Sequence, residues 1–264
     1  AIFWIFLWLA RTAMKGPAVL VGTLWICTSA LFSTYANGQF LQRFHDPCAH
    51  TFVRFALSSF LGLVCSSWLA QQPLTPVLPE LSRRLLLPSA LLLTANLLNS
   101  MSMLCSGVTL TYVVKSLIPF FTVICCRIRG ERFETSIYLS LVPVCLGVSL
   151  ASATDVQCSS LGLLCALGSS MAQTLLNISS KERIQTLKLS GMEAFTVMAT
   201  VCTLLSLPLL AVSYAKDEGN GVVTALNASF SPCPISGKAV QVIAMAALAY
   251  HVEYTLNFLF VALC

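Results

Sequence analysis

The stretch Thr109-Leu-Thr-Tyr-Val-Val-Lys-Ser-Leu-Ile-Pro-Phe-Phe121 places one lysine, Lys115, inside an apolar run that has no acidic residue nearby. A lone ammonium at the centre of a membrane helix costs about 2.5 to 3.5 kcal/mol on insertion scales, so such a charge usually has a role. Apolar residues continue on both sides of Lys115, which argues against a side chain that only reaches back to the membrane surface. The sequence therefore predicts a buried partner or an anionic ligand for Lys115.

Composition places this charge in a membrane protein. Of the 264 residues, 57% are hydrophobic and only 9% are charged, and the mean hydropathy is +0.83. Soluble domains carry about 25% charged residues. Apolar runs of about 20 residues recur along the chain, as in transmembrane helices, whereas strands of a membrane barrel are about ten residues long and alternate in polarity. The sequence predicts an all-α, multi-pass transmembrane helical bundle.

About eight membrane spans are expected. Their predicted ranges are 17–39, 49–70, 85–107, 108–126, 135–153, 160–180, 191–214 and 238–264. The third and fourth spans meet without polar residues between them, which predicts a tight hairpin after Gly107. We expect a loop over 40–50 and a rigid polar link over 71–84. The apolar and basic segment 1–16 is too short to span a bilayer, and its role stays open.

Lysine and arginine are distributed unequally between alternate connections. One set holds Arg11, Lys15, Arg83, Arg84, Arg127, Arg129, Arg132, Lys181, Arg183 and Lys188, and the other holds Arg43, Arg54, Lys216 and Lys238. Because positive residues gather on the cytoplasmic side, we expect an integral membrane protein whose N-terminus is cytoplasmic. The sequon at Asn227 then faces the lumen or exterior, and the sequon at Asn177 faces the cytoplasm, where it would not be glycosylated.

Thr111 and Lys115 are four residues apart and share a helix face, which suits a phosphate group. Lysine binds phosphate as a compact charge with three donors, and a threonine hydroxyl adds a hydrogen bond. Pro119 removes one backbone hydrogen bond from the same helix, so we expect a kink there. The kink either opens a cavity or fits the helix to its neighbours.

A second polar cluster, Tyr250-His251-Val252-Glu253-Tyr254, interrupts the last apolar span. Tyr250 and Tyr254 share a face and could stack on a sugar or base, and Glu253 could neutralise a cation or carry a proton. Contacts with neighbouring helices are the alternative reading of this cluster. For Arg54, the sequence leaves both a cavity and the membrane surface open. Asn96 and Gln173 are interpreted as hydrogen-bonding residues between helices.

Enzyme readings find no support in the sequence. No Gly-x-Ser-x-Gly, phosphate-binding glycine-rich loop or His-Glu-x-x-His motif is present, and the 12 cysteines lack Cys-x-x-Cys spacing. We therefore expect neither catalysis nor a metal or cofactor.

Several short motifs follow one another in a specific order. They are Thr111-Tyr-Val-Val-Lys115, Pro119-Phe-Phe-Thr-Val123, Gly130-Glu-Arg132, Leu139-Ser-Leu-Val-Pro143, Gly147-Val-Ser-Leu-Ala151, Asn177-Ile-Ser-Ser-Lys181 and Tyr250-His251. Together they resemble the triose-phosphate translocator family, the plastid sugar-phosphate and related Golgi nucleotide-sugar transporters of the drug/metabolite transporter superfamily. The resemblance implies a lysine at Lys115 that binds the substrate phosphate, with Thr111 and Tyr250 nearby.

The resemblance also implies ten helices in two inverted five-helix repeats. Residues 17–153 would form the first repeat, and 154–264 an incomplete second repeat with three spans. Family members carry a further span with a Lys-Arg pair, so we expect this chain to be truncated at its C-terminus.

The favoured hypothesis is an antiporter that exchanges a phosphorylated solute, of the sugar-phosphate or triose-phosphate type, for phosphate by alternating access. An exchanger of nucleotide sugars for nucleoside monophosphates is the second hypothesis, because Ile118 replaces the glutamate of plastid members and Val252-Glu253-Tyr254-Thr255 departs from the usual pattern. A non-transporting scaffold is the third. The expected membrane is that of the Golgi, endoplasmic reticulum or plastid. The expected partners are the two solutes, the lipid bilayer and, as an open alternative, a second copy of the chain in a homodimer, but no nucleic acid.

Overall fold

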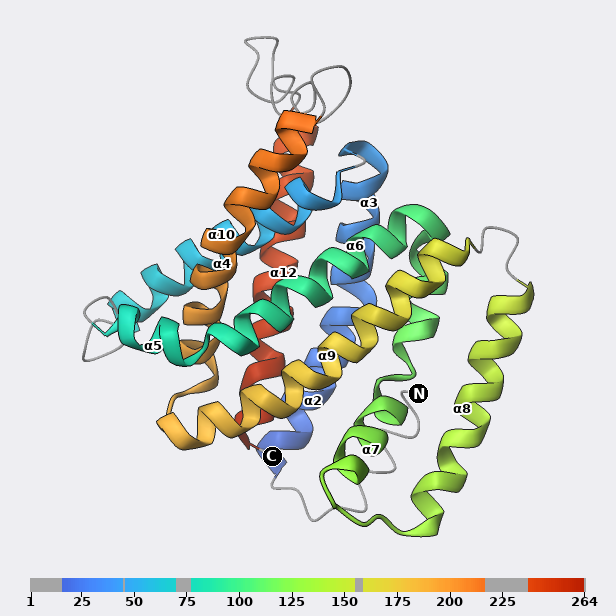
Figure 1. Cartoon of the computed structure of the whole chain (residues 1–264). Coiled ribbons are helices and arrows are strands. Elements are labelled where there is room, and N and C mark those ends of the chain that lie inside the picture. Colours follow the sequence, from blue (N-terminus) through green and yellow to red (C-terminus); the bar gives the residue numbers. More distant parts are fainter. Residues whose placement is uncertain (1–15, 45, 70–76, 155–158, 217–236, 264) are drawn as a thin grey trace.

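The computed structural model describes residues 16–44, 46–69, 77–154, 159–216 and 237–263, and none of these residues lies in a strand (Figure 1). The elements are α2 (Gly16–Cys27), the π-helix η1 (Thr28–Ser33), α3 (Thr34–Phe44), α4 (Pro47–Leu69), α5 (Leu78–Arg84), α6 (Leu86–Lys115), α7 (Ile118–Ile128), α8 (Thr135–Thr154), α9 (Ser160–Leu187), α10 (Gly191–Lys216) and α12 (Gly237–Leu263). Five helices are long and apolar enough to cross a membrane by length and composition. They are Pro47–Ser66, Leu86–Lys115, Thr135–Ala153, Ser160–Leu187 and Gly191–Val212. The predicted fold class, an all-α multi-pass membrane bundle, is confirmed.

Two parts of the sequence-based prediction concern residues outside those described. They are the N-terminal segment 1–15 and the loop that carries the Asn227 sequon.

The first predicted span is longer than expected. It runs without interruption from Gly16 to Phe44 through α2, η1 and α3. The predicted loop over 40–50 is wrong for most of its length, because Phe40 and Leu41 are buried and keep the chain helical. α4 then begins at Pro47, since the first turn of a helix tolerates a residue without a backbone N–H.

The predicted polar link over 71–84 is also wrong from Leu78 onward, where the chain forms the short helix α5. Pro79 lies in its first turn, and Arg84 Nε donates to Glu80 Oε1 over 2.8 Å, one turn away. Leu81 is buried against the core. Local pairing and one buried leucine are therefore enough to make a helix of this proline-containing segment.

The predicted hairpin after Gly107 is confirmed. Gly107 has φ 78° and ψ 166°, a conformation that is essentially restricted to glycine. The hydroxyls of Ser102 and Thr111 lie 2.8 Å apart, whereas nine residues of straight helix would separate them by about 13.5 Å. The chain therefore reverses direction within α6.

The second arm of this hairpin is broken, not merely kinked. α6 ends at Lys115, and α7 starts at Ile118 with Pro119 in its first turn. Because Pro119 has no N–H to donate to the Lys115 carbonyl, it weakens the helix at this point, where the structure has a break. A single helix over 108–126 with Lys115 at its middle is therefore wrong, since Lys115 lies at a helix end.

α6 and α9 lie side by side along their length (Figure 1). Small residues permit this approach, as predicted for the sixth span: a Cβ added at Gly162 would overlap Ser106, and one at Gly168 would lie 3.1 Å from Leu98. α9 also continues past its predicted end at Ser180, and Ile184 packs into the core. The α6–α9 pair is thus a closely packed wall of the bundle.

α12 runs through the interior and contacts α4, α10 and the α2–α3 segment. Phe195 of α10 stacks on Tyr254 and Phe258 of α12, with ring centroids 5.8 and 5.7 Å away. These rings form the centre of the main hydrophobic core. α12 therefore brings its polar cluster into the middle of the protein.

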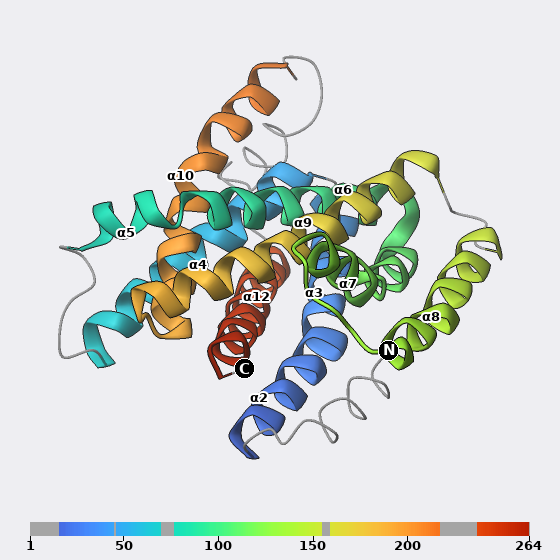
Figure 2. The ribbon, with the colours of Figure 1, turned by 60° about the horizontal axis from the view of Figure 1, so that its bottom comes forward.

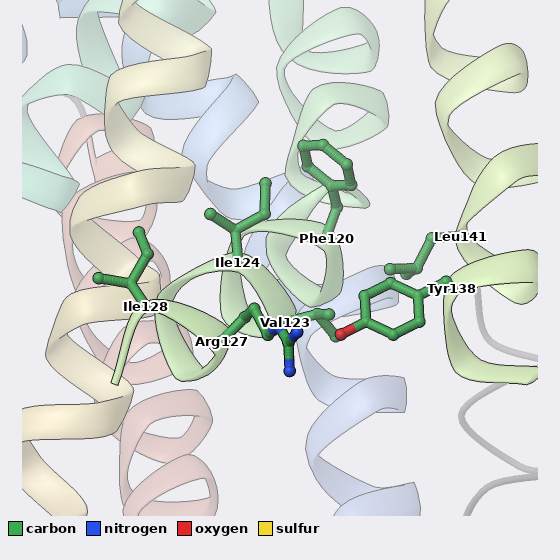
Figure 3. A pocket seen from close by; sticks show the side chains of 7 residues that line it. All are labelled: Phe120, Val123, Ile124, Arg127, Ile128, Tyr138 and Leu141. Atoms are coloured by element: carbon green, nitrogen blue, oxygen red, sulfur yellow. The ribbon is translucent and has the colours of Figure 1, made fainter. Parts of the chain in front are cut away.

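α8 stands at the edge of the bundle in both overall views (Figures 1 and 2). Leu139, Leu146 and Leu150 are among its exposed side chains, which suits contact with lipid. An open groove separates α8 from α7 (Figure 3). Its lining is apolar except for Arg127 and Tyr138, and it holds none of the predicted site residues.

Candidate anion-binding site

Arg54 of α4 is buried, with only 3% of its surface exposed. Its guanidinium carbon lies 3.9 Å from the centre of the Tyr250 ring on α12, within the range of a cation–π interaction. Its Nε and Nη1 atoms have no hydrogen-bond partner among the described residues. Of the two alternatives that the sequence left open, the structure shows the inward one.

His50, Arg54 and Ser58 form a polar face on α4. They follow one another at four-residue spacing and therefore share one side of the helix, and all three are buried. His50 Nε2 and Ser58 Oγ, like the Arg54 atoms, have no partner in the described part of the chain. Sequence analysis missed His50 and Ser58, although polar residues at helical spacing in an apolar span were a usable signal.

One ring nitrogen of His50 is paired and the other is not. Its Nδ1 lies 2.9 Å from Ser100 Oγ, which also lies 3.0 Å from the Asn96 carbonyl oxygen. The Nε2 atom has no partner in the described part of the chain. His50 therefore ties α4 to α6 through Nδ1 and leaves Nε2 open.

Tyr250 and Tyr254 differ in their hydroxyls. Both rings are buried, with centroids 4.4 Å apart. The Tyr254 hydroxyl donates to Gln173 Oε1 and accepts from Asn96 Nδ2, each over 3.3 Å, so the predicted helix-linking role of Asn96 and Gln173 is confirmed. The Tyr250 hydroxyl has no partner among the described residues. Tyr254 therefore joins α12 to α6 and α9, and Tyr250 keeps its donor free.

Lys115 is partly buried and is compensated in three ways. It is the last residue of α6, where the helix dipole favours a cation. Its Nζ lies 5.2 Å from the Tyr112 ring. Glu253 attracts it electrostatically, while Arg54 repels it. The carboxylate of Glu253 is held by Ser29 of η1, whose Oγ donates to Oε1 over 2.8 Å.

Thr111 and His251 are placed differently from the sequence-based expectation. Thr111 is fully buried, and its hydroxyl donates to the Gly107 carbonyl over 2.8 Å, so its proton is used inside the hairpin. His251 packs its ring against Phe195, with centroids 5.7 Å apart, and its Nδ1 has no partner in the described part of the chain. Thr111 thus shapes the turn that positions Lys115.

Two cations and one carboxylate, on three different helices, therefore act on one another inside the bundle. Buried donors without partners carry a cost of about 1 to 3 kcal/mol each, and more when charged. An anion bound by the open Nε and Nη1 of Arg54 would relieve this cost. The arrangement suits the binding of a small anion.

The comparison with protein families extends over nearly the whole chain. The model of the Triose-phosphate Transporter family matches residues 18–263. The chain belongs to this family. The family is one of transporters, and five helices of the described residues are long and apolar enough to cross a membrane, so the chain is an integral membrane protein of a transporter family.

Several triose-phosphate transporter relatives are similar to this chain. A triose phosphate/phosphate translocator of non-green plastids from Brassica oleracea var. botrytis is 28% identical over 92% of this chain and 59% of its own length. The phosphoenolpyruvate/phosphate translocator 1 of Arabidopsis thaliana is 27% identical over 92% and 58%. The glucose-6-phosphate/phosphate translocator 1 of Arabidopsis thaliana is 29% identical over 76% and 52%. The chain thus spans less than two thirds of the length of these relatives.

Proposed function

We propose that the protein is an antiporter that exchanges a phosphorylated organic solute for inorganic phosphate, with Lys115 as the phosphate contact. The observation that carries this proposal is the place of Lys115, at a helix break inside the bundle with its Nζ 5.2 Å from the Tyr112 ring. The names of the relatives, which are phosphate translocators for triose phosphate, phosphoenolpyruvate and glucose 6-phosphate, support the same class of cargo.

The broken helix supplies two contributions to phosphate binding. Lys115 offers a compact positive charge with three donors. The N-terminus of α7 starts three residues later, and the positive end of a helix dipole favours an anion. Discontinuous helices of this kind bind charged substrates in many transporters. Tyr250 and His251 line the part of the site that receives the organic portion of the solute.

Thr111 acts through the Gly107 hairpin in this proposal, and Glu253 acts as the resident counter-ion of Lys115. Transport proceeds by alternating access between a first repeat over 17–153 and a second over 154–264. The relatives' names favour a plastid membrane over the Golgi or endoplasmic reticulum. The charge asymmetry favours a cytoplasmic N-terminus.

Counter-exchange in liposomes tests this function. Vesicles loaded with phosphate are assayed for uptake of labelled phosphate by the wild type, Lys115→Ala and Arg43→Ala, an exposed cation on α3 as the matched control. We expect Lys115→Ala to lower exchange by about 100-fold or more, since a charged hydrogen-bonding group is lost, and Arg43→Ala to have little effect. Undiminished exchange by Lys115→Ala would refute the proposal.

Two further outcomes separate the other hypotheses. Exchange of a nucleoside monophosphate in preference to phosphate would replace the proposed cargo with a nucleotide sugar. Absence of any exchange by folded wild-type protein would leave a scaffold. Cross-linking in the membrane reports separately on whether the protein forms a homodimer.

A further inference from the structure

We propose that the groove between α7 and α8 binds one anionic phospholipid, with an acyl chain along its apolar lining and the headgroup phosphate at Arg127 and Tyr138. The groove has a volume of about 170 Å³ and is partly open (Figure 3). It contains none of the residues proposed to bind the transported solute. The inference is therefore independent of the proposed function and of which solute the protein carries.

The groove exists because α8 packs against the bundle at one level. Val148 is the buried residue in the described part of α8, and it packs with Leu110 and Val114 of α6. Tyr138 and Leu141 lie in the N-terminal half of α8, about two to three turns before Val148. Both side chains keep part of their surface exposed and line the groove instead of the core. A second molecule is therefore needed to cover this half of the helix.

The lining is polar at one end and apolar at the other. Arg127 precedes the connection 129–134 and Tyr138 follows it, so both lie near the same ends of their helices. Phe120 lies about two turns deeper than Arg127, and Leu141 about one turn deeper than Tyr138. A membrane phospholipid has its phosphate at the surface and its acyl chains inside, and tyrosine favours the boundary between them. The polarity of the groove matches this arrangement.

Arg127 selects for a negatively charged lipid. It takes part in neither of the ion pairs found among the described residues. The Tyr138 hydroxyl points toward Arg127 and adds a neutral donor (Figure 3). A guanidinium binds phosphate oxygens through a fork of N–H donors. Basic pockets between membrane helices bind anionic headgroups in this way, on the side of the membrane where positive residues gather.

A phospholipid fits the groove better than the other occupants. None of its lining residues is acidic, so the same surface of a second copy of the chain offers no counter-charge to Arg127. A free phosphate ion would gain nothing from the apolar lining. A cavity of about 150 Å³ holds a molecule the size of benzene, so this groove accommodates a segment of one acyl chain.

Native mass spectrometry of the full chain in detergent tests the lipid site. Phosphatidylglycerol and phosphatidylcholine with identical acyl chains are titrated separately. We expect one tightly bound lipid per chain and about fivefold higher affinity for phosphatidylglycerol, because one arginine near a membrane surface contributes about that factor. Arg127→Gln should remove this preference, and Arg127→Lys should keep most of it. Arg132→Gln is the matched control, since it removes an exposed cation outside the lining, and it should keep the full preference.

Two further measurements test the apolar half of the site and the source of the phosphate. Leu141→Trp fills the groove and should weaken the binding of both lipids. Inorganic phosphate should not displace bound phosphatidylglycerol. Equal affinity of the wild type for the two lipids would overturn the inference, as would an equal loss of preference in Arg127→Gln and Arg132→Gln. Displacement of the lipid by phosphate would also overturn it, and so would a lipid-free dimer that Leu141→Trp dissociates, because the groove would then belong to a second copy.

Discussion

Tyr250 and Tyr254 lie one turn apart on α12, and their hydroxyls are used in opposite ways. The Tyr254 hydroxyl is bonded to both Asn96 and Gln173, so it ties three helices together. The Tyr250 hydroxyl is just as buried and has no partner among the described residues, and an unpaired arginine lies over its ring. On one face of α12, therefore, one tyrosine hydroxyl is used in packing and the next has no partner among the described residues.

Across the bundle, buried side chains differ in how their polar atoms are paired. Side chains that hold helices together are satisfied by protein, as at the Ser102–Thr111 pair of the hairpin. Side chains that bind a solute have unpaired polar atoms while the solute is absent. The free-energy cost of these unpaired atoms is offset by the stability of the rest of the fold. Variants of the hydrogen-bonded side chains should therefore change stability, and variants of the buried side chains without partners should change transport.

The largest effect on stability is expected at the Gly107 hairpin, where the Ser102 and Thr111 hydroxyls are paired. Gly107→Ala forces a side chain into a backbone conformation reserved for glycine, which costs about 1 to 3 kcal/mol. Thermal unfolding in detergent should show a clear decrease in Tm. Gly147→Ala is the matched control, because a Cβ there would meet nothing within 4 Å and Gly147 of α8 does not have a positive φ. A Tm for Gly107→Ala equal to that of the wild type would contradict the hairpin geometry.

Removal of the two tyrosine hydroxyls is the direct test of the comparison. Tyr254→Phe removes the hydrogen bonds to Asn96 Nδ2 and Gln173 Oε1 and should cost about 0.5 to 1.5 kcal/mol of stability. Its effect on the half-saturation concentration should be small. Tyr250→Phe loses no hydrogen bond to a described residue, so its Tm should be unchanged, but its half-saturation concentration for the transported solute should rise by about tenfold. The reverse pattern would remove the distinction between the two tyrosines.

The smallest effects are expected at two adjacent serines of α4. Ser58→Ala removes an open hydroxyl and should raise the half-saturation concentration about threefold without loss of stability. Ser59→Ala breaks the contact with Thr200 and should lower the free energy of unfolding by about 0.6 kcal/mol, with transport preserved. Both are measured by exchange in liposomes and by unfolding in detergent. Similar effects of the two variants on transport would place Ser58 outside the site.

Some of these features were predictable from local sequence. The hairpin after Gly107 followed from two apolar spans that meet without polar residues, and the break near Lys115 followed in part from Pro119. The break was underestimated because a proline can either kink a helix or end it, and neighbouring packing decides which. The helix over 78–84 was missed because its prolines indicated a loop, although Pro79 fits a first turn.

Only some features of the candidate site could be predicted from the sequence. Lys115 was predicted as a site residue from the free-energy cost of its charge inside an apolar run alone, since an unpaired charge there is unusual. The pairing of Thr111 with Ser102 could not be foreseen, because it depends on the reversal of the chain between them. The same is true of the Arg54 contact with Tyr250, which joins residues almost 200 positions apart.

The sequence by itself determined that this protein is a helical membrane bundle with a charged residue in its fourth apolar segment, because bilayer thickness and hydropathy act on each segment separately. Only the tertiary structure decided which way each helix faces. Arg54 could have reached the membrane surface, and Tyr250 could have bonded as Tyr254 does. The rotation of α4 against α12 set both outcomes, and such a rotation depends on the packing of whole helices and not on any local pattern.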